Sequence, residues 1–184
     1  DQDRYAELSY TRAVSAVRRG TFKDEIVPVA VPQRKGDPMI FDTDECPRDT
    51  GYDTLSKMPA AFQKGGVTTA GNSSSISDGA SAVVVMAKEK AEELGCPVLA
   101  TVGAQASAGL DMKYVLVAPM LAVPKCLKKE GIGIDDVDIF EINEAFAGST
   151  VAVMREPELD PEKVNVNGCL LYTSDAADDL HCLD

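Results

Sequence analysis

The strongest constraint on the fold is an alternation of strand-like and helix-like segments that begins near residue 82. The run AVVVM has the apolar character of a buried strand, and the charged run KEKAEEL after it is typical of a short helix. In chain order the pattern predicts a strand at 82–86, a helix at 88–94, a strand at 98–104, a helix at 121–130, a strand at 137–142, a helix at 144–155 and a strand at 163–167. Strands that alternate with helices favour a layered α/β core.

The first part of the chain predicts one long helix and then a turn-rich region. Residues 3–19 place apolar side chains on one helical face, with Asp3 as the predicted N-cap and Gly20 as the stop. Residues 25–31 are strand-like, but a proline lies inside this segment and another follows it, which favours an edge strand or an irregular end. Residues 33–81 are rich in turn formers, and loop regions of such length are often functional. The predicted helical face consists of Ala6, Tyr10, Ala13, Val14 and Val17.

Charge and composition argue against several classes of partner. The formal net charge is −12, and no Lys/Arg cluster is long enough to follow a phosphate backbone, so no nucleic-acid partner is predicted. No apolar run approaches the roughly 20 residues that cross a bilayer, so no membrane partner is predicted. The five cysteines form no CxxC pair, which predicts neither a disulfide framework nor a metal site. Reduced thiols in a cytoplasmic protein are the corresponding expectation.

Two short stretches carry most of the functional information. They are TTAGNSSSISDGASAVVVM at 68–86 and DIFEINEAFA at 138–147, with EIVPV at 25–29 upstream and DPEKVNVNG at 160–168 downstream. Together these stretches closely resemble the thiolases, and the resemblance covers residues 1–168. The NEAFA box is highly specific, and its distance from TAGN also suits the family.

The resemblance implies a thiolase-like α/β fold that this chain represents only in part. In that fold two βαβ-rich halves, each with a five-stranded mixed sheet, are stacked in layers, and the first half carries a loop-domain insertion. Residues 1–95 are then expected to be the C-terminal part of the first domain. Within them, 1–75 belong to the insertion and 76–95 form the closing strand and helix. Residues 96–168 are expected to begin the second domain.

Asn143 is the candidate catalytic residue. In the family this asparagine orients a water that, with a histidine elsewhere, forms an oxyanion hole for the thioester oxygen of acyl-CoA. Preorganised donors at that oxygen stabilise the charge that develops beside a thioester. The sequence without the resemblance favours a helix N-cap at Asn143, with Glu144 in the first turn of the helix, and the two roles are compatible. Phe146 resembles the family aromatic that lines the pantetheine channel, although ordinary core packing is the alternative.

Further residues match positions that contact coenzyme A in the family. Ala70 and Ser74 lie in the TAGNSSS turn, where plain turn chemistry is the alternative for Ser74. Phe62 matches an aromatic near the coenzyme, and Thr54 matches a small hydroxylated position. Arg48 is a candidate for a phosphate or adenine contact, but it matches only with a one-residue gap, and a solvated surface arginine remains the alternative.

The family's covalent machinery has no counterpart at matching positions of this sequence. Thiolases use a nucleophilic Cys, expected before Asp1, and a His in a Gly-His-Pro turn and a second Cys, both expected after Gly168. The remaining candidates lie outside any matching motif and are predicted to be uninvolved: Cys46, Cys96, Cys126 and His181. Residues 169–184 resemble a translated sequencing adapter and are predicted to be a non-native tail, with a diverged natural C-terminus as the alternative.

The resemblance implies a parent enzyme of the acetyl-CoA C-acyltransferase type, either an acetoacetyl-CoA thiolase or a longer-chain 3-ketoacyl-CoA thiolase. Such an enzyme performs thiolytic cleavage or Claisen condensation through an acyl-cysteine. Acyl-CoA and CoA are its substrates, no cofactor is bound permanently, and the parent is expected to be a homodimer or homotetramer. The present chain is predicted to be inactive. The alternatives are a non-catalytic thiolase-like protein that binds acyl-CoA or lipid, and a fragment that aggregates.

Overall fold

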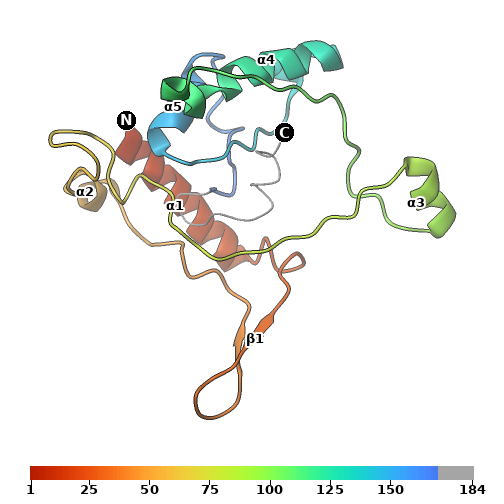
Figure 1. Cartoon of the computed structure of the whole chain (residues 1–184), viewed down its shortest axis with the longest axis horizontal. Helices are drawn as coiled ribbons and strands as arrows, with labels where there is room; N and C mark the ends of the chain where they lie inside the picture. The colour runs from red at the N-terminus through yellow and green to blue at the C-terminus, as the bar shows by residue number, and fades with distance from the viewer. Residues whose placement is uncertain (170–184) are drawn as a thin grey trace.

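The computed structural model describes residues 1–169 of the 184-residue chain. The long N-terminal helix α1 packs against α2 and α5, while a hairpin and a small helix, α3, project from the body (Figure 1). The elements in chain order are α1 Gln2–Arg19, β1 Val29–Val31, β2 Met39–Phe41, α2 Tyr52–Leu55, α3 Lys88–Leu94, the 3-10 helix η1 Met112–Val117, α4 Pro119–Glu130, the 3-10 helix η2 Ile134–Asp136 and α5 Ala147–Arg155.

Helix α1 is the predicted long helix, and it is confirmed almost residue for residue. Gly20 ends it in the left-handed conformation, with φ of 69°. Val14 and Val17 of the predicted face are only half-buried, because the buried stripe is rotated toward Tyr5 and Ser9. The N-cap prediction was wrong, since the cap residue is Asp1 and no side chain caps the helix. The buried stripe consists of Tyr5, Ala6, Ser9, Tyr10, Ala13 and Ala16.

Two apolar clusters form the core of the described chain. The first packs the buried face of α1 against Leu55 of α2 and Ala147 of α5. The second lies between α5 and the segments on either side of it, and α4 and η1 contribute half-buried side chains to it. Its buried members are Phe140, Ile142, Val153, Leu159 and Val164. Helix α5 contributes to both clusters and therefore joins them.

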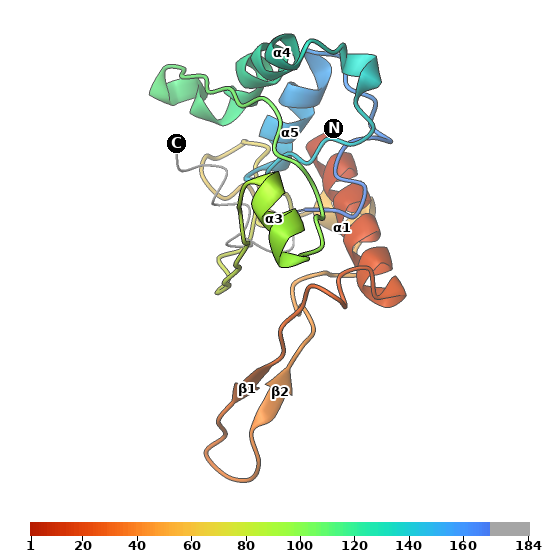
Figure 2. The same cartoon turned by 90° about the vertical axis from the view of Figure 1, so that its right-hand side faces the viewer.

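The predicted strand at 25–31 forms only in its second half. β1 pairs antiparallel with β2, in a register that places Val29 opposite Phe41 and Val31 opposite Met39. Pro28 and Pro32 lie on either side of β1, and neither has an N–H to extend the ladder. Figure 2 shows this hairpin extending away from the rest of the molecule. It is therefore an edge element, as its prolines indicate.

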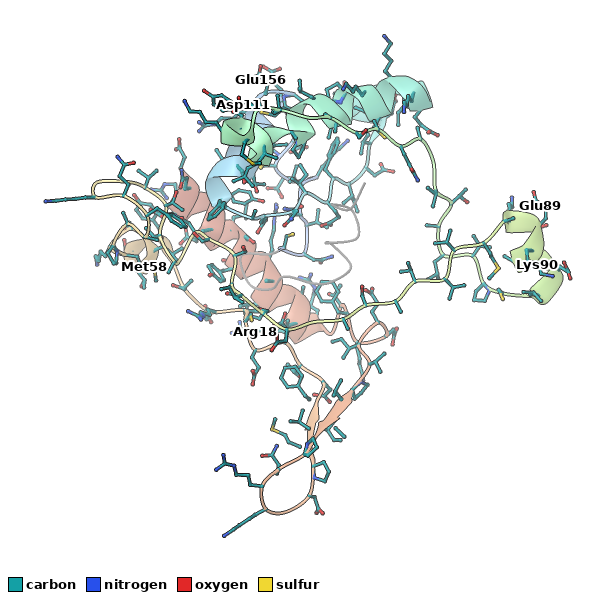
Figure 3. All side chains as sticks on the ribbon, in the orientation of Figure 1. Arg18, Met58, Glu89, Lys90, Asp111 and Glu156 are labelled. Carbon is teal, nitrogen blue, oxygen red and sulfur yellow. The ribbon has the colours of Figure 1, made fainter. Side chains whose placement is uncertain are left out.

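The predicted strands at 82–86 and 98–104 were wrong as regular structure. Within residues 1–169 neither segment has a β-ladder partner, and Val83, Val84 and Val85 are 71%, 85% and 75% exposed. A strand is stable only when a neighbouring strand satisfies its N–H and C=O groups, and the described chain supplies no such neighbour here. The helix between the two segments, α3, forms as predicted, and its Glu89 and Lys90 lie far from the body of the molecule (Figure 3).

The predicted strands at 137–142 and 163–167 meet at a single point. Phe140 and Val164 form an isolated parallel bridge, in which the Phe140 N–H donates to Lys163 at 2.8 Å and the Asn165 N–H donates to Phe140 at 2.8 Å. The hairpin β1–β2 is the only sheet in the described chain. The layered α/β prediction is thus met in its order of segments but not in its sheets.

Gly168 brings the end of the described chain against α1. Its φ is 76°, and a Cβ built there would lie 2.6 Å from the backbone oxygen of Ser9 and 2.9 Å from the backbone nitrogen of Ala13. Both obstructing atoms belong to the backbone of a packed helix, which cannot rotate aside. A side chain at position 168 would therefore meet two obstacles: the left-handed backbone conformation and a steric clash with the backbone of α1.

Replacement of Gly168 by alanine is expected to lower the free energy of unfolding by at least about 2 kcal/mol, because the left-handed conformation and the contact with α1 both oppose a Cβ. Gly109→Ala is the matched control, since a Cβ there would meet no atom within 4 Å, and a change within about 0.5 kcal/mol is expected. Urea unfolding of the purified chain measures both values. Equal midpoints for the two variants would show that Gly168 does not pack as described.

Candidate functional site

The two sequence stretches that carry the resemblance lie side by side. The Ser74 N–H donates to the Ala145 carbonyl at 3.2 Å, and the Ala147 N–H donates to the Asn72 carbonyl at 3.0 Å. Between these hydrogen bonds Ser73 and Phe146 form an antiparallel bridge. The turn at 70–74 and the segment at 143–147 therefore form one continuous surface at the start of α5.

Asn143 faces outward from this surface. Its side chain is exposed, and it makes no hydrogen bond within residues 1–169. The N-cap reading was wrong, because α5 begins at Ala147 and its N-cap is Phe146, in an extended conformation. Asn143 instead lies in an extended segment in which Ile142 and Glu144 point inward. Its amide is thus available to a ligand.

Glu144 is fully buried and is not in the first turn of a helix. The Tyr5 hydroxyl donates to its Oε1 at 2.5 Å, and the Ser9 hydroxyl donates to its Oε2 at 2.6 Å. Asn165 Nδ2 also donates to Oε1, at 2.8 Å. Burial, followed by the negative charge of Glu144, raises the pKa of Tyr5 far above its ordinary value. The tyrosine therefore remains a donor at every physiological pH.

Asn165 holds the backbone directly before Asn143. Its Oδ1 accepts from the Ile142 N–H at 2.7 Å, and its Nδ2 donates to the Ile142 carbonyl at 2.8 Å. Its φ of 47° is left-handed, a conformation that asparagine tolerates better than most residues. Asn165 replaces a strand partner for Ile142, since it satisfies both of that residue's backbone groups.

The turn at 69–73 is organised by Asn72, whose side chain is fully buried. Its Nδ2 donates to Asp3 of α1 at 2.8 Å, and its Oδ1 accepts from the Thr69 N–H at 2.8 Å. The φ of Gly71 in this turn is not positive. A Cβ at position 71 would lie 2.6 Å from Met58 Sδ and 2.7 Å from Leu55 Cδ2, so a larger residue there would displace the ends of these two side chains.

Two predicted coenzyme contacts come together at this turn. The rings of Phe62 and Phe146 pack edge to face, with centroids 5.9 Å apart and an interplanar angle of 77°. Phe62 is 75% exposed, so its free ring face is open to solvent. Ala70 is exposed and Ser74 is half-buried on the same turn. The aromatic pair and the turn therefore border the surface on which Asn143 lies.

Thr54 and Arg48 precede the 70–74 turn in the sequence. Thr54 is an exposed residue of α2, whose first turn is stabilised by a hydrogen bond from the Tyr52 N–H to Glu7 of α1 at 3.0 Å. Arg48 is exposed, and its charge acts on Tyr10, where it opposes the rise in pKa that burial causes. In the described chain no hydrogen bond or ion pair joins Thr54 or Arg48 to Asn143.

Five buried polar residues around this surface were not predicted from the sequence to take part in the site: Tyr5, Ser9, Asn72, Glu144 and Asn165. One signal was available for Tyr5 and Ser9. They lie four residues apart and directly precede Ala6 and Tyr10 of the predicted apolar face, and polar groups that border a buried face require partners. Nothing in the sequence identifies Glu144 as their acceptor, because it is 135 residues from Ser9 and 139 from Tyr5.

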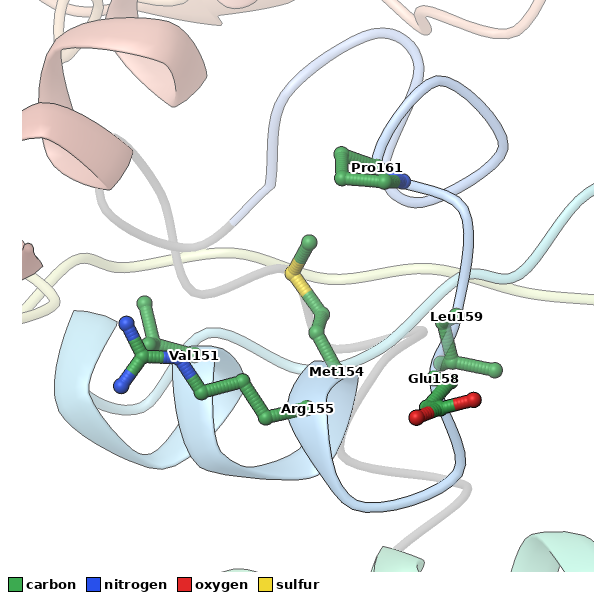
Figure 4. A pocket seen from close by; sticks show the side chains of 6 residues that line it. All are labelled: Val151, Met154, Arg155, Glu158, Leu159 and Pro161. Carbon is green, nitrogen blue, oxygen red and sulfur yellow. The ribbon is translucent and has the colours of Figure 1, made fainter.

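A pocket lies elsewhere, at the C-terminal end of α5, and Figure 4 shows its lining. Its six lining residues are Val151, Met154, Arg155, Glu158, Leu159 and Pro161. Asn143 is not among them. Residues 1–169 contain no cluster of three or more His, Cys, Asp or Glu side chains suited to a metal ion. No helix of the same residues combines the length and apolar character that crossing a membrane requires.

Comparison with known families places each part of the chain. Residues 1–89 match the family model "Thiolase, N-terminal domain", and residues 96–171 match "Thiolase, C-terminal domain". The chain is 47% identical over 169 residues to the acetyl-CoA acetyltransferase of Pseudomonas aeruginosa, an alignment that covers 91% of this chain and 43% of that protein. It is 49% identical over 168 residues to the corresponding protein of Thiocystis violacea, with the same coverage. The chain therefore spans less than half the length of these curated relatives.

Solved structures give the same result. The Bacillus anthracis acetyl-CoA acetyltransferase superposes with a TM-score of 0.90 at 41% identity, over 94% of this chain and 44% of that one. Human mitochondrial 3-ketoacyl-CoA thiolase in complex with CoA gives 0.87 at 35% identity, over 94% and 43%. The dimeric peroxisomal thiolase of Saccharomyces cerevisiae gives 0.84 at 35% identity, over 95% and 43%.

The free energy of unfolding is expected to fall as the pH rises above about 10, because unfolded Tyr5 loses its proton near its ordinary pKa of 10.0 whereas the buried hydroxyl keeps it. This proton contributes a slope of about 1.4 kcal/mol per pH unit, and Tyr5→Phe removes that contribution. Unfolding by urea between pH 9 and 11.5 measures the slope. Tyr114→Phe is the matched control. A slope that is the same in both variants would contradict the buried environment of Tyr5.

Proposed function

The chain belongs to the thiolase family, and we propose that the protein from which it comes is an acetyl-CoA C-acyltransferase. Its reaction is thiolytic cleavage of a 3-ketoacyl-CoA or the reverse Claisen condensation, through an acyl-cysteine intermediate. The observation that carries this proposal is the exposed amide of Asn143 on the surface where the 70–74 turn meets the 143–147 segment.

Asn143 is the residue that acts on the thioester. Removal of a proton beside a thioester carbonyl, or attack on that carbonyl, places negative charge on its oxygen. A fixed donor at this oxygen lowers the barrier by about 3 kcal/mol in enzymes that use one. An amide that directs a water toward the oxygen supplies such a donor. The exposed side chain of Asn143 has no competing hydrogen bond within residues 1–169, so it is free for this role.

The residues around Asn143 are proposed to bind the coenzyme. The edge-to-face pair of Phe62 and Phe146 offers an apolar wall for the pantetheine chain. Ala70 leaves room at the turn, and the half-buried Ser74 hydroxyl is placed to pair with a pantetheine amide. Support for this arrangement comes from the backbone hydrogen bonds that join the turn to the NEAFA segment.

Two more residues are proposed to contact the polar end of the coenzyme. Arg48 and Thr54 are both exposed, and the guanidinium of Arg48 suits a phosphate by charge and an adenine ring by stacking. The parent protein is proposed to be a homodimer or homotetramer, as the yeast relative is described as dimeric.

Residues 1–184 by themselves are expected to show no turnover of acetoacetyl-CoA, because no cysteine or histidine of this chain matches the nucleophile or proton carriers of the family. A thiolysis assay that follows loss of the enolate absorbance compares this chain with the protein encoded by the intact gene. Turnover by residues 1–184 alone would contradict the assignment of the nucleophile to another segment.

Asn143→Ala in the intact protein is expected to lower kcat by about 10²-fold to 10³-fold, because one donor to the developing charge is lost. The unfolding midpoint should change little, since the Asn143 side chain is exposed. Asn167→Ala is the matched control, because the Asn167 side chain accepts only a long hydrogen bond within residues 1–169, from Arg19 at the far end of α1 at 3.5 Å. Unchanged kcat in Asn143→Ala would refute the catalytic role. Binding of acyl-CoA without any turnover in the intact protein would favour a non-catalytic relative.

A further inference from the structure

Asn143 is held by its two neighbours rather than by its own side chain. Ile142 is 8% exposed and Glu144 is 0% exposed, so the residues on both sides of the outward-facing Asn143 are buried. Both backbone polar groups of Ile142, its N–H and its C=O, are bonded by the side chain of Asn165. The side chain of Glu144 is bonded by groups from α1 and again by Asn165.

The carboxylate of Glu144 is suited to this position for a chemical reason. Its two oxygens are acceptors only, and within residues 1–169 donors reach them from α1 and from the segment at 163–167. Tyr5 and Ser9 donate to different oxygens, which fixes the orientation of the carboxylate plane as well as its position. A buried carboxylate is costly unless its hydrogen bonds are made, so the segment is stable only in this arrangement.

We propose that Glu144 is a positioning residue for Asn143: its buried carboxylate, together with Asn165, fixes the backbone on both sides of Asn143 and so directs the exposed amide toward the thioester. The proposal deepens the function proposed above and depends on it. An amide that donates to a developing charge must be placed to within about 0.5 Å, and a loop does not achieve this without support from a packed element. Helix α1, through Tyr5 and Ser9, supplies that support.

Glu144→Gln tests the proposal, because it keeps the volume and replaces one acceptor oxygen by an NH₂ group that faces donors. Steady-state kinetics of the intact protein are measured for Glu144→Gln, Asn143→Ala and the double variant. In Glu144→Gln, kcat is expected to fall by about 10-fold or more while KM for the acyl-CoA stays within about 2-fold, because the coenzyme contacts are untouched. The double variant should lose nothing further relative to Asn143→Ala, since Glu144 then has no amide to position.

A merely structural role for Glu144 gives a different result. In that case Glu144→Gln lowers kcat by the same factor with and without Asn143, and this additive outcome overturns the proposal. A change confined to KM overturns it as well. Glu156→Gln is the matched control, because Glu156 is an exposed carboxylate after α5 (Figure 3), and it should leave both constants unchanged.

The same measurements distinguish failure of the proposed function from failure of the positioning role alone. If Asn143→Ala leaves kcat unchanged, the proposed function fails at Asn143 itself, and the positioning role fails with it. If Asn143→Ala lowers kcat but the effects of the two substitutions simply add, the function stands and only the positioning role fails. Should Glu144→Gln not fold, Tyr5→Phe replaces it in the same cycle, since this variant removes one donor to Oε1 and leaves the carboxylate in place.

Discussion

The hydrogen bonds between Glu144 and helix α1 join the two ends of the described chain. Tyr5 and Ser9 are separated from Glu144 by 139 and 135 residues, and between them they occupy both carboxylate oxygens. Asn165 extends the same network to the segment that follows α5. A carboxylate without exposed surface is stable only when such donors are present, so α1, the NEAFA segment and the 163–167 segment must be in place together. The site is thus formed by tertiary structure rather than by a local motif.

The same constraint explains the contrast between the body of the molecule and its extensions. Segments that reach α1 are packed, whereas the hairpin β1–β2 and the apolar segments on either side of α3 project away from it (Figures 1 and 2). The apolar side chains of these segments have the composition of sheet strands, but the described residues provide no sheet for them. The chain also spans less than half the length of the relatives it matches.

Local pattern predicted the helices well and the strands poorly. Gly20, Gly95 and Gly131 end α1, α3 and α4 in left-handed conformations, because a helix and its stop are specified within a few residues. Strands depend on distant partners, and the segment at 98–104 shows that an apolar run alone does not form one. The motif residues were found by resemblance. The acceptor role of Glu144 was not, because a glutamate beside a helix start is ordinarily read as a surface charge.

A crystal structure of the intact protein with a bound acyl-CoA analogue tests the central claim most directly. The account expects the Asn143 amide to lie within hydrogen-bond distance of the thioester oxygen, directly or through one water, with the bonds from Tyr5 and Ser9 to Glu144 retained. An analogue bound on another face of the molecule, or an Asn143 amide turned into the protein while Glu144 is exposed to solvent, would contradict the account.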